Sequence, residues 1–162
     1  MSTPKLIYFP VNGRGEAIRA LLNHAKFAFE DCRMSKPEFA PLQESGHSPM
    51  GGCPIWEEDG FVQCQGNSIL RVLGIRLGYY SEDAETCYNI DSLMDFAEDL
   101  QPSIGQYLFP VQFGRPHGDR QRFLDGWFRK HMKVCSDRLA SHGKPFLAGT
   151  DRPTIADFKM FA

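Results

Sequence analysis

Apolar residues in the first third of the chain occur as short runs and at helical spacing. Residues Lys5 to Phe9 form a short apolar run that predicts a buried strand. After a turn, apolar residues recur one helical turn apart and predict a helix that contains Ile18, Leu21, Leu22 and Ala25. Residues Phe27 to Arg33 alternate enough to predict a second strand. The expected order is therefore β-α-β.

The next segment combines an irregular stretch with a hairpin and a helix. Prolines interrupt residues 35–52, so we expect irregular backbone there, with one helical turn near Phe39. Asp59-Gly60 stands between two apolar runs and predicts a β-hairpin. A largely apolar helix should follow and end at Gly78. The resulting order, β-α-β-(α)-β-β-α, is typical of a thioredoxin-like layer.

The remainder of the chain has a helical pattern. It predicts one long helix over residues 82–108 and another over residues 119–141, with a loop bracketed by Pro110 and Pro116. Thr154 with an acid three residues later, Asp157, is a capping-box pattern that predicts the start of a further helix.

The expected fold class is therefore α/β plus all-α. It consists of a thioredoxin-like N-terminal domain over residues 1–78, followed by an all-helical C-terminal domain over residues 84–162.

Composition excludes several classes of partner. The formal net charge is -2 and the sequence pI is about 6.2, so the chain lacks the basic surface that nucleic acid requires. No apolar run approaches the ~18 residues of a membrane span. The N-terminus lacks the apolar core of a signal peptide. We expect a cytoplasmic protein with neither nucleic-acid nor membrane partners.

The cysteines and histidines indicate neither a disulfide framework nor a metal site. The 5 cysteines are odd in number and form no C-x-x-C motif, which favours a reducing compartment. The 5 histidines show no metal-ligand spacing, so no metal is predicted. No bound cofactor is predicted either.

The most informative stretch is Gln65-Gly66-Asn67-Ser68, where a predicted strand turns directly into a helix. Backbone N–H groups and the positive end of the helix dipole converge there, which suits a carboxylate. The Gln65 amide can hold the polar ends of an amino acid. Gly66 stands where a hydroxyl would add a further hydrogen bond.

Tyr8 lies at the end of the first strand, before a glycine-containing turn. Its phenol could donate to a thiolate and lower that thiol's pKa, with Arg14 adding positive potential; the alternatives are a core tyrosine and a solvated arginine. A dinucleotide-binding interpretation of Asn12 to Ile18 fails, because Ile18 replaces the third glycine.

Cys53-Pro54 opens the third strand. In a thioredoxin-like layer this proline is often cis, and the preceding residue can then pair its backbone with an extended peptide; an ordinary trans proline is the alternative. No second cysteine or nearby histidine supports Cys53 as a nucleophile.

Together these residues resemble a soluble glutathione transferase. The similarity runs from Lys5 to the chain end, with the helix start near Gln65 closest to the pi class. It rests on four ordered matches: residues 6–19, 65–74, 90–100 and 153–158. We therefore identify the chain as pi- or sigma-like. Because the chain ends within the last predicted helix, we expect that it lacks the C-terminal end of the family's helical domain.

The resemblance implies a set of roles. Tyr8 would activate the glutathione thiol, with Arg14 in support. The implied glutathione contacts also include Phe39, Gln43, Gly52, Cys53, Pro54, Gln65, Gly66 and Asp99, the last reaching across a homodimer interface. The hydrophobic second site would draw on Phe9, Val11 and Tyr107. Glutathione would be a co-substrate.

The expected function is conjugation of the glutathione thiolate to small hydrophobic electrophiles, a detoxification reaction, with possible peroxidase or isomerase side activity. The alternative is a weak or inactive binding or structural relative. It rests on Gly66, Gln43 and Phe39, which replace the family's usual Ser, Lys and Trp. Met50 also stands where an aromatic subunit key is usual. A thiol-disulfide enzyme is disfavoured, since Tyr8 stands where that chemistry needs a cysteine.

Overall fold

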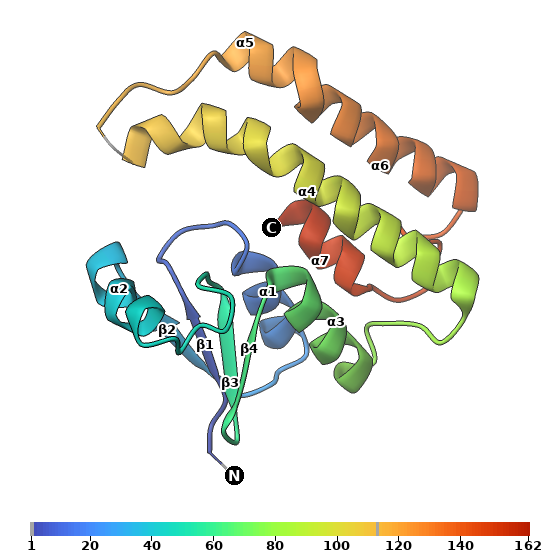
Figure 1. The fold of residues 1–162 in the computed structure, drawn as a ribbon. Helices are drawn as coiled ribbons and strands as arrows, with labels where there is room; N and C mark the ends of the chain where they lie inside the picture. Colours follow the sequence, from blue (N-terminus) through green and yellow to red (C-terminus); the bar gives the residue numbers. More distant parts are fainter. Residues whose placement is uncertain (1, 113) are drawn as a thin grey trace. The chain divides into compact units, whose positions relative to one another are not determined.

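The computed structural model describes residues 2–112 and 114–162, with side chains at all of these positions except 109, 112 and 127. The chain divides into two compact units (Figure 1). The first comprises Met1–Ser81 with Phe161–Ala162, and the second comprises Glu82–Met160.

The first unit is built on a small mixed sheet. Its elements are β1 (Lys5–Tyr8), α1 (Glu16–His24), β2 (Glu30–Arg33), α2 (Lys36–Glu44), β3 (Ile55–Glu58), β4 (Phe61–Cys64) and α3 (Gly66–Leu77). The strand order is β2-β1-β3-β4. Strand β1 runs parallel to β2 and antiparallel to β3, and β3 and β4 form the antiparallel hairpin predicted at Asp59-Gly60. The thioredoxin-like prediction is confirmed.

Alternating side chains of the strands face two different helical layers. Leu6 and Ile7 in β1 are both buried, although successive strand residues point to opposite faces. Ile7 packs with Ile55 and with Phe39 of α2. Figure 1 shows the sheet between α2 on one side and the pair α1 and α3 on the other. Fully buried side chains of α1 and α3 fill that second layer, among them Ile18, Leu22, Leu70 and Leu73.

The second strand is shorter than predicted, because the residues before it continue the turn after α1. Lys26 adopts a φ of 53°, and the Phe27 N–H donates to the Leu22 carbonyl at 2.9 Å. Pairing of β2 begins only at Glu30. The aromatic ring of Phe27 packs against Trp56 instead.

Helix α2 is longer than the single turn expected near Phe39. A capping arrangement starts it, because the N–H and hydroxyl of Ser35 both donate to the Glu38 carboxylate, at 2.7 and 2.6 Å. Pro37 lies in the first turn, where a backbone N–H has no intrahelical acceptor, so the lack of an N–H in proline costs no helix hydrogen bond. The Ser35-x-x-Glu38 spacing and Pro37 are the sequence signals from which the full helix could have been predicted.

The second unit is entirely helical, as predicted. It consists of α4 (Ala84–Gln112), α5 (Arg120–Phe123), the π-helical turn η1 (Leu124–Phe128), α6 (Arg129–His142) and α7 (Ile155–Phe161). Helix α4 continues through Pro110, which had been expected to start a loop. The helix predicted over residues 119–141 is interrupted, since Gly126 has φ −86° and ψ −124°, a conformation that glycine tolerates.

Hydrogen bonds join the helices of this unit. Arg138 on α6 donates to the side chains of Asn89 and Ser92 on α4, at 3.3 and 3.2 Å. Lys159 on α7 donates to Glu98 on α4 at 2.6 Å. The predicted capping box is present, because the N–H and hydroxyl of Thr154 both donate to the Asp157 carboxylate.

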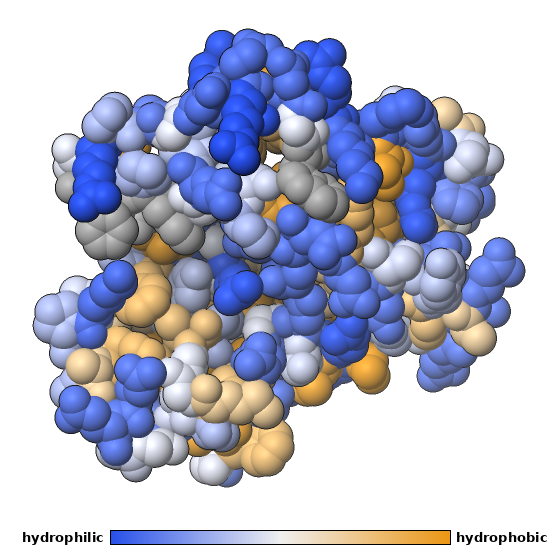
Figure 2. All heavy atoms as spheres, turned by 45° about the horizontal axis from the view of Figure 1, so that its top comes forward, coloured by the Kyte–Doolittle hydropathy of each residue, from blue (hydrophilic) through white to orange (hydrophobic). Residues whose placement is uncertain are grey.

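The visible face in Figure 2 is mostly hydrophilic with scattered apolar patches. Among the described helices, none has the length and apolar character needed to cross a membrane.

Candidate functional site

Tyr8 ends β1, and its half-buried side chain reaches the turn that follows. Its phenol oxygen accepts a hydrogen bond from the backbone N–H of Arg14 at 3.1 Å. Burial raises the pKa of Tyr8 above its ordinary value of 10.0, although the bond from Arg14 opposes that shift. The phenol is therefore neutral at physiological pH. Because the bond from Arg14 uses an oxygen lone pair, the phenol O–H can still donate to a ligand.

The two glycines around Arg14 are explained by the Tyr8 ring. A β-carbon at Gly13 would lie 2.8 Å from the Tyr8 hydroxyl oxygen, and one at Gly15 would lie 2.5 Å from the Tyr8 Cδ1. Any side chain at either position would displace the ring. The Gly13-Arg14-Gly15 turn therefore needs its glycines to make room for the Tyr8 ring. In a dinucleotide-binding motif, by contrast, glycines let the backbone approach a phosphate.

Arg19 is a positioning residue that the sequence did not single out. Its side chain is 2% exposed, and its Cζ lies 5.6 Å from the centre of the Tyr8 ring. The guanidinium also donates to Asp31, Glu16 and the carbonyls of Phe9 and Val11, at 3.0 to 3.3 Å. It thus fixes the chain that follows Tyr8, at Phe9 and Val11. The sequence signal for this role of Arg19 was its position in α1 between two apolar residues that are buried, Ile18 and Leu22.

A small pocket of about 110 Å³ lies within the first unit, at the junction of β4 and α3. Its lining includes five residues predicted for the glutathione site: Arg14, Gly52, Cys53, Gln65 and Gly66. Met50 and Cys64 complete it. The Cys53-Pro54 peptide bond is cis, the form expected for a proline at this position.

The start of α3 forms one wall of this pocket. Gln65 has a φ of 74°, a left-handed value that is uncommon for a residue with a side chain. Its carbonyl accepts the Ile69 N–H at 3.0 Å, so the helix begins immediately after it. The N–H groups of the first turn have no intrahelical acceptor and can bind an anion. A β-carbon at Gly66 would lie 3.1 Å from the carbonyl oxygen of Arg14.

Two thiols line the pocket, those of Cys53 and Cys64. Burial raises the pKa of Cys53 above its ordinary value, which disfavours the thiolate form. All five cysteines are free. Within residues 2–112 and 114–162, no three His, Cys, Asp or Glu side chains are grouped as metal ligands would be.

Two predicted glutathione contacts are engaged elsewhere. The Gln43 amide donates to the Gly51 carbonyl at 2.6 Å and so holds the loop before β3. Phe39 is 8% exposed and packs in the core with Ile7 and Ile55. The structure does not bring either side chain to the lining of the pocket.

The residues predicted for the hydrophobic site belong to different units. Phe9 and Val11 follow Tyr8 and are half-buried, and the Phe9 ring lies 5.7 Å from Phe39. Tyr107 lies in the helical unit, where it lines a separate pocket together with Asp99.

Comparisons with known proteins place the chain in a family. No family model matches it. Over 158 residues it is 34% identical to probable glutathione S-transferase 8 of Caenorhabditis elegans, which covers 94% of this chain and 74% of that protein. It is 35% identical to glutathione S-transferase 2 of the same organism over 160 residues, which covers 96% of this chain and 84% of that protein.

A solved structure agrees with these relatives. The crystal structure of the glutathione S-transferase from Ascaris lumbricoides superimposes with a TM-score of 0.82 at 28% identity, and the match covers 98% of this chain and 78% of that one. Identity above 30% across most of both chains, together with the shared fold, shows that the chain belongs to the glutathione S-transferase family.

Proposed function

We propose that the chain is a glutathione transferase that binds glutathione in the pocket of its thioredoxin-like unit and activates the thiol through Tyr8. The observation that carries this proposal is the position of Arg14, which lines the small pocket together with the start of α3 and whose backbone N–H donates to the neutral Tyr8 phenol. Tyr8 itself is not among the residues that line the pocket. The names of the relatives support the same activity.

Each part of the site has a role in the proposal. The γ-glutamyl carboxylate binds the free N–H groups at Gln65 and Gly66, because a helix N-terminus stabilises an anion. The backbone of Cys53 pairs with the cysteinyl part of glutathione, beside Pro54. The Tyr8 O–H then donates to the glutathione sulfur.

The reaction proceeds by nucleophilic substitution or addition. Hydrogen bonding to Tyr8 stabilises the thiolate over the thiol, so the thiol proton leaves to solvent. The thiolate sulfur attacks an electrophilic carbon; with an aryl halide a carbon–sulfur bond forms and halide departs with the bonding electron pair. Phe9 and Val11, next to Tyr8, are the proposed contacts of the electrophile.

A second candidate function is glutathione binding without efficient catalysis. It is favoured by Gln43, whose amide is occupied by Gly51, and by Gly66, which supplies no hydroxyl. Each missing bond to a charged group weakens binding by about 1.5–3 kcal/mol. Under this second function glutathione binds weakly, and the helical unit provides an additional binding surface.

Calorimetry with glutathione and an aryl-halide conjugation assay separate these candidates. Saturable binding with conjugation that falls in Tyr8→Phe supports the transferase. Binding without conjugation supports the second function. An absence of binding at millimolar glutathione would overturn both, and equal conjugation rates in wild type and Tyr8→Phe would overturn the role of Tyr8.

The proposed active form is a cytoplasmic homodimer in which the partner's Asp99 reaches the γ-glutamyl group. Met50, beside the pocket, is 69% exposed and accepts a 3.5 Å contact at its sulfur from the Gln65 amide, so an apolar surface adjoins the site. Light scattering after gel filtration should give twice the monomer mass, and Met50→Glu should lower it. Monomeric wild type would contradict this arrangement. The pi- or sigma-like class, the electrophile and any peroxidase or isomerase activity stay predictions.

A further inference from the structure

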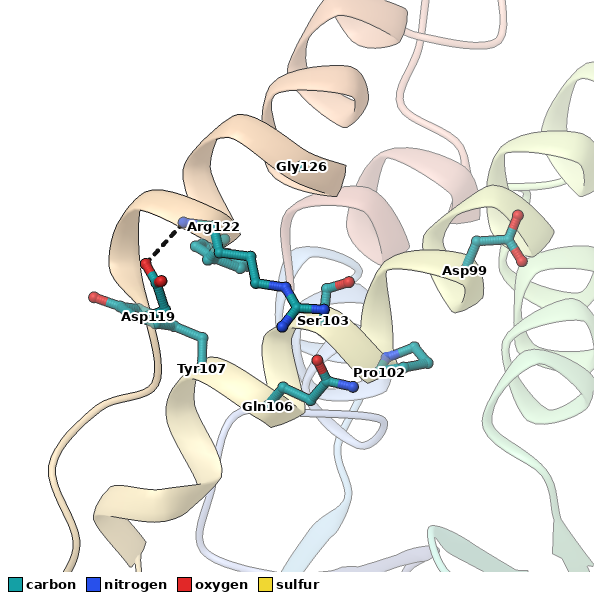
Figure 3. A pocket seen from close by; sticks show the side chains of 9 residues that line it. Asp99, Pro102, Ser103, Gln106, Tyr107, Asp119, Arg122 and Gly126 are labelled. Atoms are coloured by element: carbon teal, nitrogen blue, oxygen red, sulfur yellow. Dashed lines mark hydrogen bonds between the residues drawn. The ribbon is translucent and has the colours of Figure 1, made fainter.

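Three sulfur-bearing residues line the small pocket at the junction of β4 and α3. Two are cysteines, Cys53 and Cys64, and the third is Met50. At about 110 Å³ the pocket has room for a metal ion but for only a few water molecules, each of which takes about 30 Å³. The larger pocket that Figure 3 shows, of about 570 Å³ in the helical unit, has no cysteine or methionine among its described lining residues. The sulfur-bearing residues are therefore grouped at the small pocket.

The strand register brings the two thiols to one face of the sheet. Cys64 is the register partner of Ile55 in the β3–β4 hairpin, and the side chains of opposed residues in an antiparallel pair lie on the same face. Cys53 packs against the core cluster that contains Ile55, so its side chain lies on this face as well. Both cysteines are free and partly exposed, which leaves them accessible to an ion.

The thioether of Met50 is directed along the pocket wall. Its sulfur accepts a contact from the Gln65 side-chain amide at 3.5 Å, and Gln65 also lines the pocket. The short loop from Met50 to Cys53 is held by Ser48, whose hydroxyl donates to the Gly52 carbonyl at 2.6 Å. Because this loop is fixed, the thioether and the Cys53 thiol are presented to the same small space.

We propose that this pocket binds a soft monovalent metal ion, Cu(I), through the thiolates of Cys53 and Cys64 and the thioether of Met50. Thiolate and thioether sulfurs are the ligands that select Cu(I), because both partners are soft. Zn²⁺ usually takes four ligands from cysteine, histidine and carboxylate side chains. Within the residues that the structure describes, no three His, Cys, Asp or Glu side chains are grouped in that way. The ligand set therefore favours Cu(I) over Zn²⁺.

The charges at the pocket are compatible with two coordinated thiolates. Metal coordination deprotonates a thiol, so both thiol protons leave to solvent as the ion binds. Two thiolates and Cu(I) together carry one net negative charge, and the positively charged Arg14 lines the same pocket. The transferase proposal uses only the backbone of Cys53 and gives Cys64 no role, so both sulfurs are available to a metal.

Anaerobic titration of the full chain with Cu(I), in competition with a colorimetric Cu(I) chelator, tests the site. Glutathione is left out because its own thiol binds Cu(I), so the result does not depend on the transferase proposal. We expect saturable binding of a single Cu(I) per chain, with thiolate-to-copper absorbance in the near ultraviolet. About a tenfold excess of Zn²⁺ should not displace the bound ion. Failure to compete with the chelator, or displacement by Zn²⁺, would overturn the proposal.

Single-sulfur variants assign the ligands. Cys64→Ser should weaken Cu(I) binding about 100-fold and Met50→Leu about tenfold, because each removes one soft ligand at nearly constant size. Met50 is 69% exposed, so its substitution does not endanger folding. The matched controls are Cys87→Ser on α4 and Met132→Leu on α6, both outside the pocket lining, and they should keep wild-type affinity. Equal losses in a test variant and its control would refute coordination at this pocket.

Discussion

The backbone of Arg14 lies between the Tyr8 phenol and the first residue of α3. Its N–H donates to the Tyr8 oxygen at 3.1 Å, and its carbonyl oxygen is 3.1 Å from the position of a β-carbon on Gly66. The two proposed ends of the glutathione site therefore both adjoin the backbone of one residue, Arg14. A change at residue 66 should reach the catalytic phenol.

Tyr8→Phe should raise the pKa of the bound glutathione thiol. A hydrogen bond to a charged group contributes about 1.5–3 kcal/mol, which corresponds to about 1–2 pKa units. Conjugation at neutral pH should fall about 10- to 100-fold, because the thiolate fraction falls by that factor. Thiolate absorbance of bound glutathione, titrated against pH, measures the shift.

Tyr88→Phe is the control for this substitution, since Tyr88 is a 69% exposed tyrosine on α4. It should leave the thiol pKa and the conjugation rate at wild-type values. A thiol pKa in Tyr8→Phe that matches wild type would show that the phenol does not contact the sulfur.

Gly66→Ala and Gly66→Ser separate the cost of a β-carbon from the benefit of a hydroxyl. Both add an atom 3.1 Å from the Arg14 carbonyl, which must shift by a few tenths of an ångström. We expect Gly66→Ala to lose about 1 kcal/mol of glutathione binding free energy and part of the conjugation rate. Gly66→Ser should bind about tenfold more tightly than Gly66→Ala. Calorimetry with glutathione on the two variants measures this difference. Equal affinities would show that the γ-glutamyl carboxylate does not bind at residue 66.

Arg19→Lys should disturb Tyr8 while preserving charge. A lysine cannot replace the several directed bonds of the guanidinium, so carbonyls at Phe9 and Val11 lose their donor. We expect a loss of about 1–3 kcal/mol in unfolding free energy and a rise in the bound thiol pKa smaller than that of Tyr8→Phe.

Arg33→Lys is the matched control, because Arg33 pairs with the same Asp31 from an exposed position. It should change neither the unfolding free energy, measured by chemical denaturation, nor the pKa of the bound glutathione thiol. If Arg19→Lys lowers stability but leaves the thiol pKa unchanged, Arg19 is structural only.

Several elements in both units were predictable because their signals are local. Asp59-Gly60 specifies the hairpin, and Thr154 with Asp157 specifies a helix start, through contacts within a few residues. The extent of α2 was missed although Ser35 and Glu38 carry an equally local signal. The interruption at Gly126 was not predictable, since an isolated glycine within a helical pattern is usually tolerated.

The site was predictable where backbone chemistry or a motif defines it, as at Gln65 and Arg14, which line the same pocket. It was less predictable where side-chain packing decides. The Gln43 amide faces Gly51 because of loop geometry that the sequence does not encode locally. Asp99 and Arg122 line one pocket although they are distant in sequence, because α5 packs beside α4.

His131 should make the stability of the chain fall in acid. It is 3% exposed and stacks on Phe96 at 4.7 Å, and burial lowers its pKa from the ordinary value of 6.5. Between the folded and the unfolded pKa of His131, the imidazole is therefore protonated in the unfolded chain and neutral in the folded chain. The stabilisation is complete above pH 6.5 and is lost as pH falls below that value, by up to about 1.4 kcal/mol per pH unit until the folded pKa is reached.

Chemical denaturation between about pH 5 and about pH 8 measures this dependence, with His131→Phe as the test variant. Phenylalanine can keep the stack on Phe96 without a titrating group, so the variant should lose less stability in acid than wild type does. Carboxyl groups with lowered pKa values, such as Asp31 and Glu58, also lose stabilisation as pH falls, but they do so below their ordinary values of 3.8 and 4.5 and so outside this window. His142→Gln, a change at an exposed histidine at the end of α6, should keep the wild-type slope. A His131→Phe slope equal to that of wild type would show that protonation of His131 does not limit acid stability.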